Sequence, residues 1–144
     1  MKFSTRSEYG LRALAILEAA YGEGPIPLRQ IANAEGISEH YLEQLFRDLR
    51  SAGIIASVRG TSGGYHLAKA PGEIDLLQII TALEGEIAPC DCVREDELSH
   101  CLRGKPCKVQ AVWLHLKDSM HRILEGITLS DMCAGRIYLQ ESIT

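Results

Sequence analysis

Residues 28–67 read LRQIANAEGISEHYLEQLFRDLRSAGIIASVRGTSGGYHL. In the first part of this stretch the apolar residues recur every three or four positions, which predicts amphipathic helices over 28–35 and 39–52. Gly36 ends the first helix, and Ser38 is a good N-cap for the second. A short helix, a tight turn and a second helix form a helix-turn-helix.

The spacing of the apolar residues then changes from helix-like to strand-like. Residues 54–58 and 65–68 have the composition of strands, and residues 59–64, Arg-Gly-Thr-Ser-Gly-Gly, have that of a turn. This hairpin follows the second helix directly and predicts a wing. The predicted fold class is mainly α: a winged helix-turn-helix domain with a small two-stranded β wing, plus a long C-terminal helix.

Further helices are predicted on both sides of this unit. One covers 7–21, with Thr5 or Ser7 as its N-cap, and another begins after Asp75. The longest covers 108–125 and has an apolar stripe at three- and four-residue spacing. The expected parts of the chain are a winged helix-turn-helix domain (1–84), a cysteine-rich loop (85–107) and a C-terminal segment containing the long helix (108–144).

Charge is unevenly distributed along the chain. The 144 residues are 46% apolar and 24% charged, as in an ordinary globular protein, and the net charge is −4. Residues 1–70 carry eight Lys and Arg against seven Asp and Glu, whereas residues 71–144 carry seven against twelve. DNA binding needs a locally basic face and not a basic total, so this balance is compatible with it.

The sequence lacks the motifs that are typical of membrane proteins, secreted proteins and several classes of enzyme. There is no run of eighteen apolar residues to span a membrane and no apolar signal-peptide core at the N-terminus, so we expect a cytoplasmic protein without membrane contact. There is also no glycine-rich phosphate loop, nucleophile elbow or paired-carboxylate arrangement. We therefore expect that the protein is not an enzyme.

The helix-turn-helix predicts a surface for double-stranded DNA, because the N-terminal part of the second helix enters the major groove. The outward residues there are predicted to be Ser38, Glu39, His40, Tyr41, Glu43 and Gln44. Gln44 can pair with adenine, and Glu43 can accept a hydrogen bond from the cytosine amino group. Arg47 and Arg50 are expected near phosphates, and Arg59 of the wing in the minor groove. The alternative, a plain helical domain with solvated charges, stays open, and the added wing favours DNA binding.

Four of the five cysteines form the pattern Cys-x-Cys-x8-Cys-x5-Cys, which comprises Cys90, Cys92, Cys101 and Cys107. Structural disulfides are not expected in a cytoplasmic protein, so this clustering indicates a metal or redox site. Thiolates ligate both iron–sulfur clusters and closed zinc sites. Zinc and metal-free redox thiols therefore stay open as alternatives to a cluster. Cys133, further along the chain, is expected to be a small core residue.

Three segments are specific enough to compare with known families: STRSEYGL at 4–11, ISEHYLEQL at 37–45 and VRGTSGGY at 58–65. They resemble the Rrf family of bacterial winged-helix regulators, in particular its iron–sulfur cluster regulators, over residues 1–132. The resemblance implies a homodimeric transcription factor, usually a repressor, that binds near-palindromic DNA operators. It also implies that the helix over 108–125 crosses its partner as the dimer interface, and that Glu43 influences which operators the cluster-free form binds.

The resemblance further implies an iron–sulfur cluster, with the two-iron form ranked before the four-iron form and zinc as the alternative metal. Cys92, Cys101 and Cys107 match the family's three cysteine ligands. Gln110 stands where some members have a histidine ligand, whereas others take a carboxylate from the first helix of the partner subunit, where Glu8 is comparable. Cluster occupancy is expected to change the pose of the wing and the second helix. The candidates for the fourth ligand are, in order, Glu8, Cys90, His100 and Gln110.

Overall fold

A computed structural model describes residues 2–95 and 107–137 of the chain. The two strands form an antiparallel hairpin, with Ile55 opposite Leu67 and Val58 opposite Gly64. The predicted mainly helical fold with a two-stranded wing is thereby confirmed. In chain order the elements are α1 (Thr5–Ala19), α2 (Leu28–Glu35), α3 (Glu39–Ser51), β1 (Ile55–Val58), β2 (Gly64–Leu67), η1 (Pro71–Glu73), α4 (Leu76–Glu84), η2 (Asp91–Val93), α5 (Lys108–Glu125) and α6 (Leu129–Ala134).

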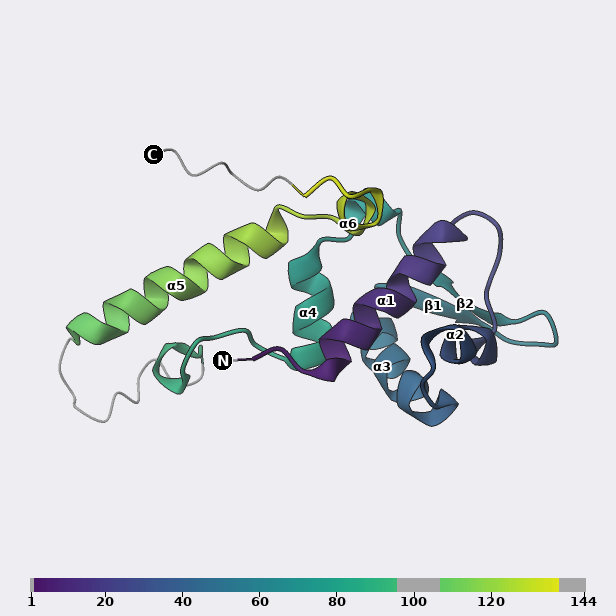
Figure 1. Ribbon diagram of the computed structural model, residues 1–144, viewed down its shortest axis with the longest axis horizontal. Helices are drawn as coiled ribbons and strands as arrows, with labels where there is room; N and C mark the ends of the chain where they lie inside the picture. Colours follow the sequence, from purple (N-terminus) through teal and green to yellow (C-terminus); the bar gives the residue numbers. More distant parts are fainter. Residues whose placement is uncertain (1, 96–106, 138–144) are drawn as a thin grey trace.

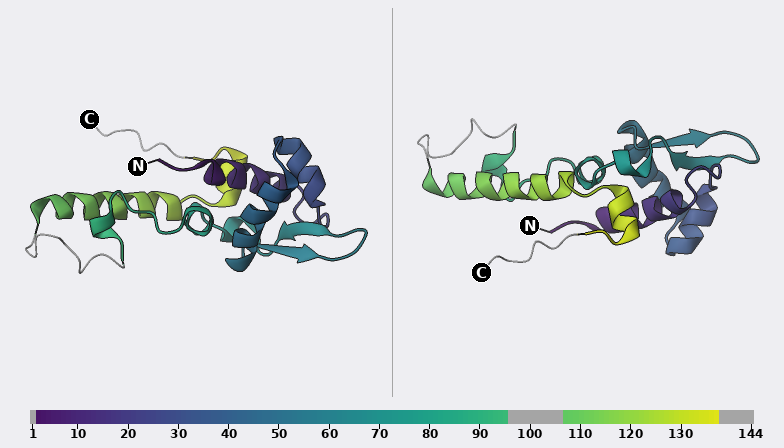
Figure 2. Two further views of the ribbon diagram at one scale, coloured as in Figure 1. Left: turned by 90° about the horizontal axis from the view of Figure 1, so that it is seen from below. Right: turned by 90° about the horizontal axis from the view of Figure 1, so that it is seen from above.

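The wing and α5 lie at opposite ends of the molecule, with the helical body between them (Figures 1 and 2). After α5 the chain returns to the body. The Leu76 amide donates to the Ile127 carbonyl (2.9 Å), and the Leu129 amide donates to the Ile74 carbonyl (2.8 Å). These bonds hold α6 on the body and fix the C-terminal end of α5. None of the described helices is long and apolar enough to span a membrane.

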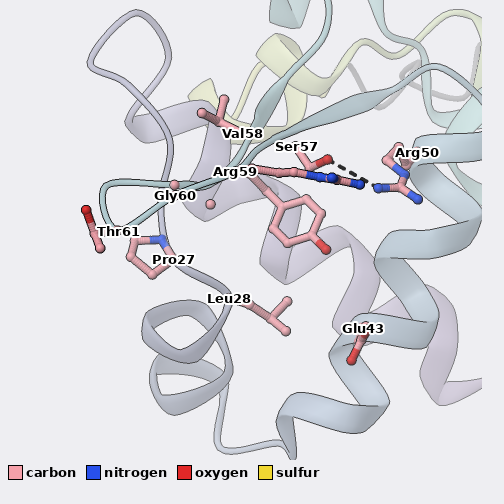
Figure 3. A pocket seen from close by; sticks show the side chains of 12 residues that line it. Pro27, Leu28, Glu43, Arg50, Ser57, Val58, Arg59, Gly60 and Thr61 are labelled. Carbon is pink, nitrogen blue, oxygen red and sulfur yellow. Dashed lines mark hydrogen bonds between the residues drawn. The ribbon is translucent and has the colours of Figure 1, made fainter.

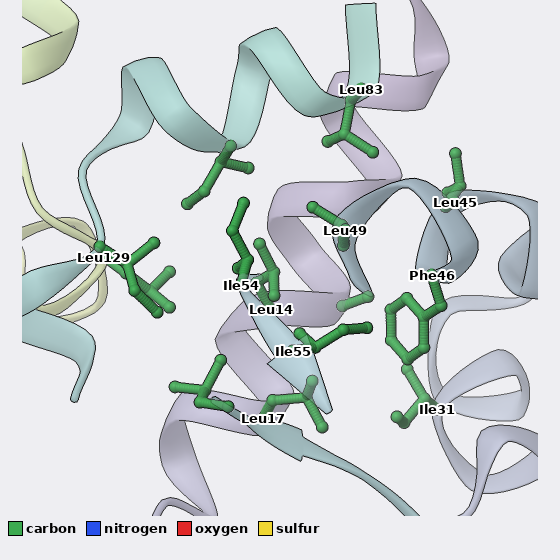
Figure 4. Packing of buried hydrophobic residues seen from close by; sticks show 14 of the residues in the cluster. Leu14, Leu17, Ile31, Leu45, Phe46, Leu49, Ile54, Ile55, Leu83 and Leu129 are labelled. Carbon is green, nitrogen blue, oxygen red and sulfur yellow. The ribbon is translucent and has the colours of Figure 1, made fainter. Parts of the chain in front are cut away.

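The core lies where α1, α3 and α4 meet the first strand (Figure 4). Leu14, Ile54, Ile79 and Leu129 are fully buried there. The predicted inner face of α3 is confirmed, because none of its four apolar residues has any exposed surface: Leu42, Leu45, Phe46 and Leu49. These side chains set the orientation of α3, so its opposite face is left on the surface.

The base of the wing is tied to both α3 and the segment before α2. The rings of Phe46 and Tyr65 pack edge to face with centroids 4.9 Å apart. Tyr65 also exchanges two backbone hydrogen bonds with Ile26, of 2.9 and 2.8 Å. Gly64 permits this approach, because it has a φ of +155° and a Cβ there would lie 2.2 Å from the Ile26 carbonyl oxygen.

The observed ends of the elements differ from the predicted ends by a residue or two. The N-cap of α1 is Ser4, whose hydroxyl accepts from the Arg6 amide (3.2 Å), so the prediction of Thr5 or Ser7 is wrong. Ser7 is buried instead, and its hydroxyl donates to Glu84 (2.7 Å). This hydrogen bond joins α1 to α4, and the periodicity of a single helix does not reveal such a contact.

Cys133 is exposed on α6 and not in the core as predicted. The short helix α6 buries Leu129, and Cys133 lies one turn further along, where its side chain is exposed next to Glu18 of α1. Partial burial of the sulfur and the neighbouring Glu18 carboxylate raise the pKa of Cys133 to about 11. The thiol is therefore protonated at neutral pH and a poor nucleophile.

Candidate nucleic-acid interface and cysteine site

The exposed face of α3 begins at its N-cap. The Ser38 hydroxyl accepts a hydrogen bond from the Tyr41 amide (3.1 Å) and satisfies an N–H group of the first turn. Gln44 is half-buried, and its side-chain nitrogen lies 3.2 Å from His40 Nε2. The first turns of α3 thus present hydrogen-bonding groups to solvent. The residues predicted to face DNA that are exposed there are Ser38, Glu39, His40, Glu43 and Arg47.

Tyr41 points toward α1 and not, as predicted, outward. It is half-buried against the core, with its ring edge to face with that of Tyr9 and centroids 6.1 Å apart. Its hydroxyl oxygen lies 3.3 Å from Thr5 Oγ1. Because Tyr41 precedes the buried Leu45 by one helical turn, it shares the side of α3 that packs on α1. It fixes α3 in place rather than extending the polar face.

A groove of about 500 Å³ lies between α3 and the wing (Figure 3). Glu43 lines it from α3, and Arg59 lines it from the wing. Arg50, at the end of α3, also lines the groove and donates from its guanidinium to the Ser57 hydroxyl of β1 (3.2 Å). This hydrogen bond joins α3 to the wing. The two arginines give the groove a basic wall that is suited to phosphates.

At the other end of the molecule, two of the clustered cysteines lie side by side. Cys90 directly precedes the short turn η2 and Cys92 lies within it, with 3.4 Å between their Sγ atoms. Cys107 is the N-cap residue of α5. Gln110, one turn further along α5, donates from Nε2 to the Cys92 carbonyl oxygen (3.0 Å). The structure therefore brings the turn with Cys92 to the start of α5, where Cys107 lies.

Of the other predicted donors, Glu8 is exposed on α1. Cys101 and His100 lie outside the described residues. Across residues 2–95 and 107–137, no group of three His, Cys, Asp or Glu side chains is close enough to hold a metal ion. The thiols of Cys92 and Cys107 are nevertheless donors of the type that iron–sulfur clusters and zinc ions take, and they belong to adjoining elements.

Polar contacts hold the segment before η2 on α5. The Lys117 ammonium, in a residue only 8% exposed, donates to Glu86 and to the Val93 carbonyl, at 2.8 Å each. His121 Nε2 lies 3.0 Å from the Ile87 carbonyl oxygen. The hydrogen bond from Lys117 lowers the pKa of Glu86, so this carboxylate stays ionised at neutral pH. The cysteine-bearing turn is thus fastened to α5 at both of its ends.

A second set of contacts leads from the same segment to α3. Glu84, at the end of α4, accepts from the Ser4 amide (2.8 Å) and from the Ser4 and Ser7 hydroxyls (2.6 and 2.7 Å). Burial alone would raise the pKa of Glu84, but these hydrogen bonds outweigh it and lower the pKa. Arg6 donates to the Leu83 carbonyl (2.9 Å) and pairs with Asp48 of α3. Side chains therefore link the end of α4 to α1, and α1 to α3.

The sequence profile of the Rrf2 family, described as "Iron-dependent Transcriptional regulator", matches residues 3–135. This chain belongs to the Rrf2 family. The regulator CymR of Bacillus subtilis is 39% identical over 134 residues, which are 93% of this chain and 91% of CymR. The regulator IscR of Aliivibrio salmonicida is 36% identical over 132 residues, which are 92% of this chain and 77% of IscR.

Solved structures of two related regulators resemble nearly the whole chain. That of CymR, titled the global cysteine regulator of B. subtilis, has a TM-score of 0.77 and 38% identity, and covers 94% of this chain and 98% of its own. That of T. potens IscR has a TM-score of 0.74 and 37% identity, and covers 100% of this chain and 94% of its own. The protein is thus a transcriptional regulator of the Rrf2 family with a winged-helix fold.

The long helix of this Rrf2 protein carries an apolar stripe that the body leaves on the surface. The residues of this stripe recur at helical spacing along one side of α5. In the single chain that side faces solvent, whereas the side that carries Lys117 faces η2. Four large apolar side chains in a row are more than a monomeric helix needs to expose. They are Val109 (57% exposed), Val112 (59%), Leu116 (41%) and Ile123 (62%).

The sequence analysis missed two residues that connect elements of the Rrf2 protein, Lys117 and Arg6. Lys117 lies at helical spacing from Trp113 and Met120, so it stands beside apolar residues on the side of α5 that faces η2. A cation among the apolar residues of a helix is a sequence signal for a buried ion pair. Arg6 carries no such signal, because its partners Leu83 and Asp48 are distant in the sequence.

Proposed function

We propose that this Rrf2 protein is a homodimeric repressor whose affinity for its operator is controlled by an iron–sulfur cluster held by Cys92, Cys101 and Cys107. Residues 1–84 bind DNA, residues 85–107 hold the cluster, and residues 108–144 form the dimer. The bound cluster supplies sensitivity to iron supply and oxidation. The carboxylate of Glu8 is the further ligand that the resemblance implies.

One observation supports this proposal above the others: the cysteine-bearing segment is connected by side chains to the recognition helix. The segment follows α4 directly, and the end of α4 holds Arg6 at the Leu83 carbonyl. Arg6 in turn pairs with Asp48 on α3. A shift of the Cys92 turn can therefore reach α3 through α4 and α1, which is what a sensor at one end of a molecule needs in order to act at the other.

Dimerisation in this proposal uses the apolar stripe of α5. A two-fold contact lets each stripe cover the same surface of its partner, which removes all four side chains from water at once. Because the two α5 helices also carry the cysteine turns, the spacing of the two winged helices depends on the same elements that hold the cluster.

Arg59 is the wing residue in this proposal that enters the minor groove. We expect Arg59→Ala to weaken operator binding by about tenfold, because one arginine contact contributes about 1–3 kcal/mol, and to lower the salt dependence of binding. Fluorescence anisotropy with labelled operator DNA at several salt concentrations measures both effects. Lys69→Ala, which removes an exposed cation outside the groove, is the control. Unchanged affinity in Arg59→Ala would remove the wing from the DNA interface.

Arg6 connects the sensing and binding ends in this proposal. Coupling between two sites typically changes affinity by about 5- to 150-fold. We expect Arg6→Gln to reduce the ratio of the operator affinities of the cluster-loaded and cluster-free forms by at least about fivefold, with cluster content unchanged. Arg136→Gln, which removes an exposed ion pair with Asp131 on α6, is the matched control. An unaltered ratio in Arg6→Gln would show that the signal takes another route.

The proposed function is tested with protein purified without oxygen. Iron and sulfide per chain are measured together with the absorption between about 320 and 460 nm, where thiolate-ligated clusters absorb. DNA is selected from a random library by the purified protein, and its affinity for the loaded and cluster-free forms is compared. A brown protein whose affinity depends on its iron supports the proposal. A colourless protein with stoichiometric zinc contradicts it.

A thiol-redox or zinc-bearing regulator of the same fold is the second candidate. Similarity to CymR and the 3.4 Å between the sulfurs of Cys90 and Cys92 favour it. A low-molecular-weight disulfide would oxidise the pair: each thiol loses one proton and one electron, a sulfur–sulfur bond forms, and the external disulfide is reduced to two thiols. Mass spectrometry detects the loss of two hydrogen atoms, which a cluster-bearing protein kept without oxygen does not show.

A further inference from the structure

A second element besides the wing borders the exposed face of α3. Glu43 and Arg50 are seven residues apart, so they share the side of α3 that lines the groove with the wing. Tyr41 and Asp48 are also seven residues apart, and both contact α1. A step of two residues turns a helix by about 200°, so the side that contacts α1 is opposite to the side that faces the wing. The exposed Arg47 lies between the two sides.

The border between α1 and α3 carries side chains that can donate hydrogen bonds to a ligand. The hydroxyl oxygens of Thr5 and Tyr41 lie 3.3 Å apart, and Thr5 is exposed. Their mutual hydrogen bond uses one of the two hydroxyl protons and leaves the other for a further acceptor. Arg12 is exposed two turns along α1, and its guanidinium carbon lies 5.8 Å from the centroid of the Tyr9 ring. These four residues form the α1 edge: Thr5, Tyr9, Arg12 and Tyr41.

The charge of Arg12 is held in position without being neutralised. A contact with the face of an aromatic ring orients a guanidinium group but supplies no negative charge. None of the ion pairs within residues 2–95 and 107–137 includes Arg12, although Glu8 precedes it by one turn. An oriented guanidinium without a carboxylate partner, close to a hydroxyl that has a proton to donate, is suited to an oxyanion such as phosphate.

We propose that the α1 edge binds the phosphate backbone of DNA on the side of α3 opposite to the wing. This inference rests on the proposed function, in which α3 enters the major groove. That groove is about 12 Å wide and has a row of phosphates along each border, so a helix within it lies between two rows. Arg50 is placed for one row, and Arg12 and the hydroxyl pair are placed for the other. Such contacts fix the orientation of α3 on DNA without reading its sequence.

The first experiment measures the affinity of the full chain for a labelled DNA duplex, selected from a random library by the unaltered chain, at several salt concentrations. We expect Arg12→Ala to weaken binding about tenfold, as for the loss of a hydrogen bond to a charged group, and to lower the salt dependence by about one phosphate contact. The loss should be the same on a duplex of unrelated sequence, because phosphates carry no sequence information. Arg12→Lys should keep the salt dependence of the unaltered chain, because it keeps the charge. Lys69→Ala, which removes an exposed cation elsewhere, is the control.

A double variant, Thr5→Val with Tyr41→Phe, tests the hydroxyl pair. It keeps the ring that packs on Tyr9 and removes both hydroxyl groups. We expect it to weaken binding at least about twofold, because one hydrogen bond is lost, with the salt dependence unchanged, because no charge is lost.

The second experiment locates the contact on DNA. Single phosphates of the selected duplex are replaced by neutral methylphosphonates, and the affinities of the unaltered chain and of Arg12→Ala are compared. If Arg12 binds one of these phosphates, replacing that phosphate should weaken binding of the unaltered chain but not of Arg12→Ala, because the same contact cannot be lost twice. Replacements along the other border of the groove should weaken both forms alike.

The outcomes separate this inference from the function on which it rests. If the unaltered chain binds the duplex and Arg12→Ala changes neither affinity nor salt dependence, the α1 edge does not contact DNA, and the proposed function stands. If Arg12→Ala binds less tightly but stays sensitive to every methylphosphonate, its effect is not a phosphate contact and the inference is wrong. If the unaltered chain binds no DNA, both proposals fail. Circular dichroism verifies that each variant is folded.

Discussion

Cys92→Ala should give a colourless, folded dimer. The substitution removes one thiolate of the proposed cluster, so iron and sulfide per chain should fall at least about tenfold. It does not remove the Cys92 carbonyl, which accepts from Gln110 and holds the turn on α5. The ion pair of Lys117 with Glu86, which fastens the same segment, is also kept. Metal analysis and visible absorption measure the loss, and sedimentation and circular dichroism measure the dimer and the fold.

The matched control for this experiment is Cys133→Ala. Cys133 is exposed on α6, and its pKa of about 11 keeps it a neutral thiol at working pH. Its removal should leave the iron content and the spectrum unchanged. A full cluster spectrum in Cys92→Ala would show that the ligand assignment is wrong, whatever the control does.

Val112→Glu should convert the dimer to a monomer and abolish specific operator binding. Val112 is 59% exposed in the centre of the apolar stripe of α5. In a two-fold interface the new carboxylate is buried twice without a partner, at a cost of several kcal/mol for each copy. We expect the dimer dissociation constant to rise by at least about 10³-fold. Operator affinity should fall by more than about 100-fold, because a monomer engages a single half-site.

Ala111→Glu is the control for the dimer experiment. Ala111 is also exposed on α5, but it lies on another side of the helix from Val109, Val112 and Leu116. The same charge at that position should leave sedimentation and operator affinity unchanged. A dimeric Val112→Glu variant would show that the stripe is not the interface.

The winged helix was predictable because its information is local. The change of spacing at residue 54, the glycine at position 36 and the serine N-cap at 38 each specify a boundary without reference to distant parts of the chain. The N-cap of α1 was mispredicted for the opposite reason. Thr5, Ser7 and Ser4 are equivalent by local chemistry, and the choice of Ser4 depends on Glu84, eighty residues away.

The exposed side of α3 was predictable, because its apolar residues specify the buried side. Glu43 lies away from that buried side and lines the groove, and Arg59 lines the same groove from the wing. Tyr41 was placed outward because tyrosine suits either side of a helix, and its contact with Tyr9 depends on how α1 crosses α3.

The sequence predicts which cysteines are grouped along the chain, but it does not predict how their sulfur atoms are arranged. Spacing alone groups the thiols, but the approach of Cys90 to Cys92 is set by the backbone of η2. The role of Lys117 depends on Glu86, thirty-one residues before it, which meets α5 when the segment after α4 folds back.

The attachment of the wing limits how this regulator can change its choice of DNA. Tyr65 is held by Phe46 of α3 and by the backbone of Ile26, and Arg50 bonds to Ser57 of β1. These contacts join the wing to α3, so we expect the two to move together. In the proposed dimer, a signal would then change the angle and separation of the two winged helices and would not release the wing or α3 from DNA separately. The signal would then change which spacings between half-sites, in base pairs, the dimer binds. The preferred half-site sequence would stay the same.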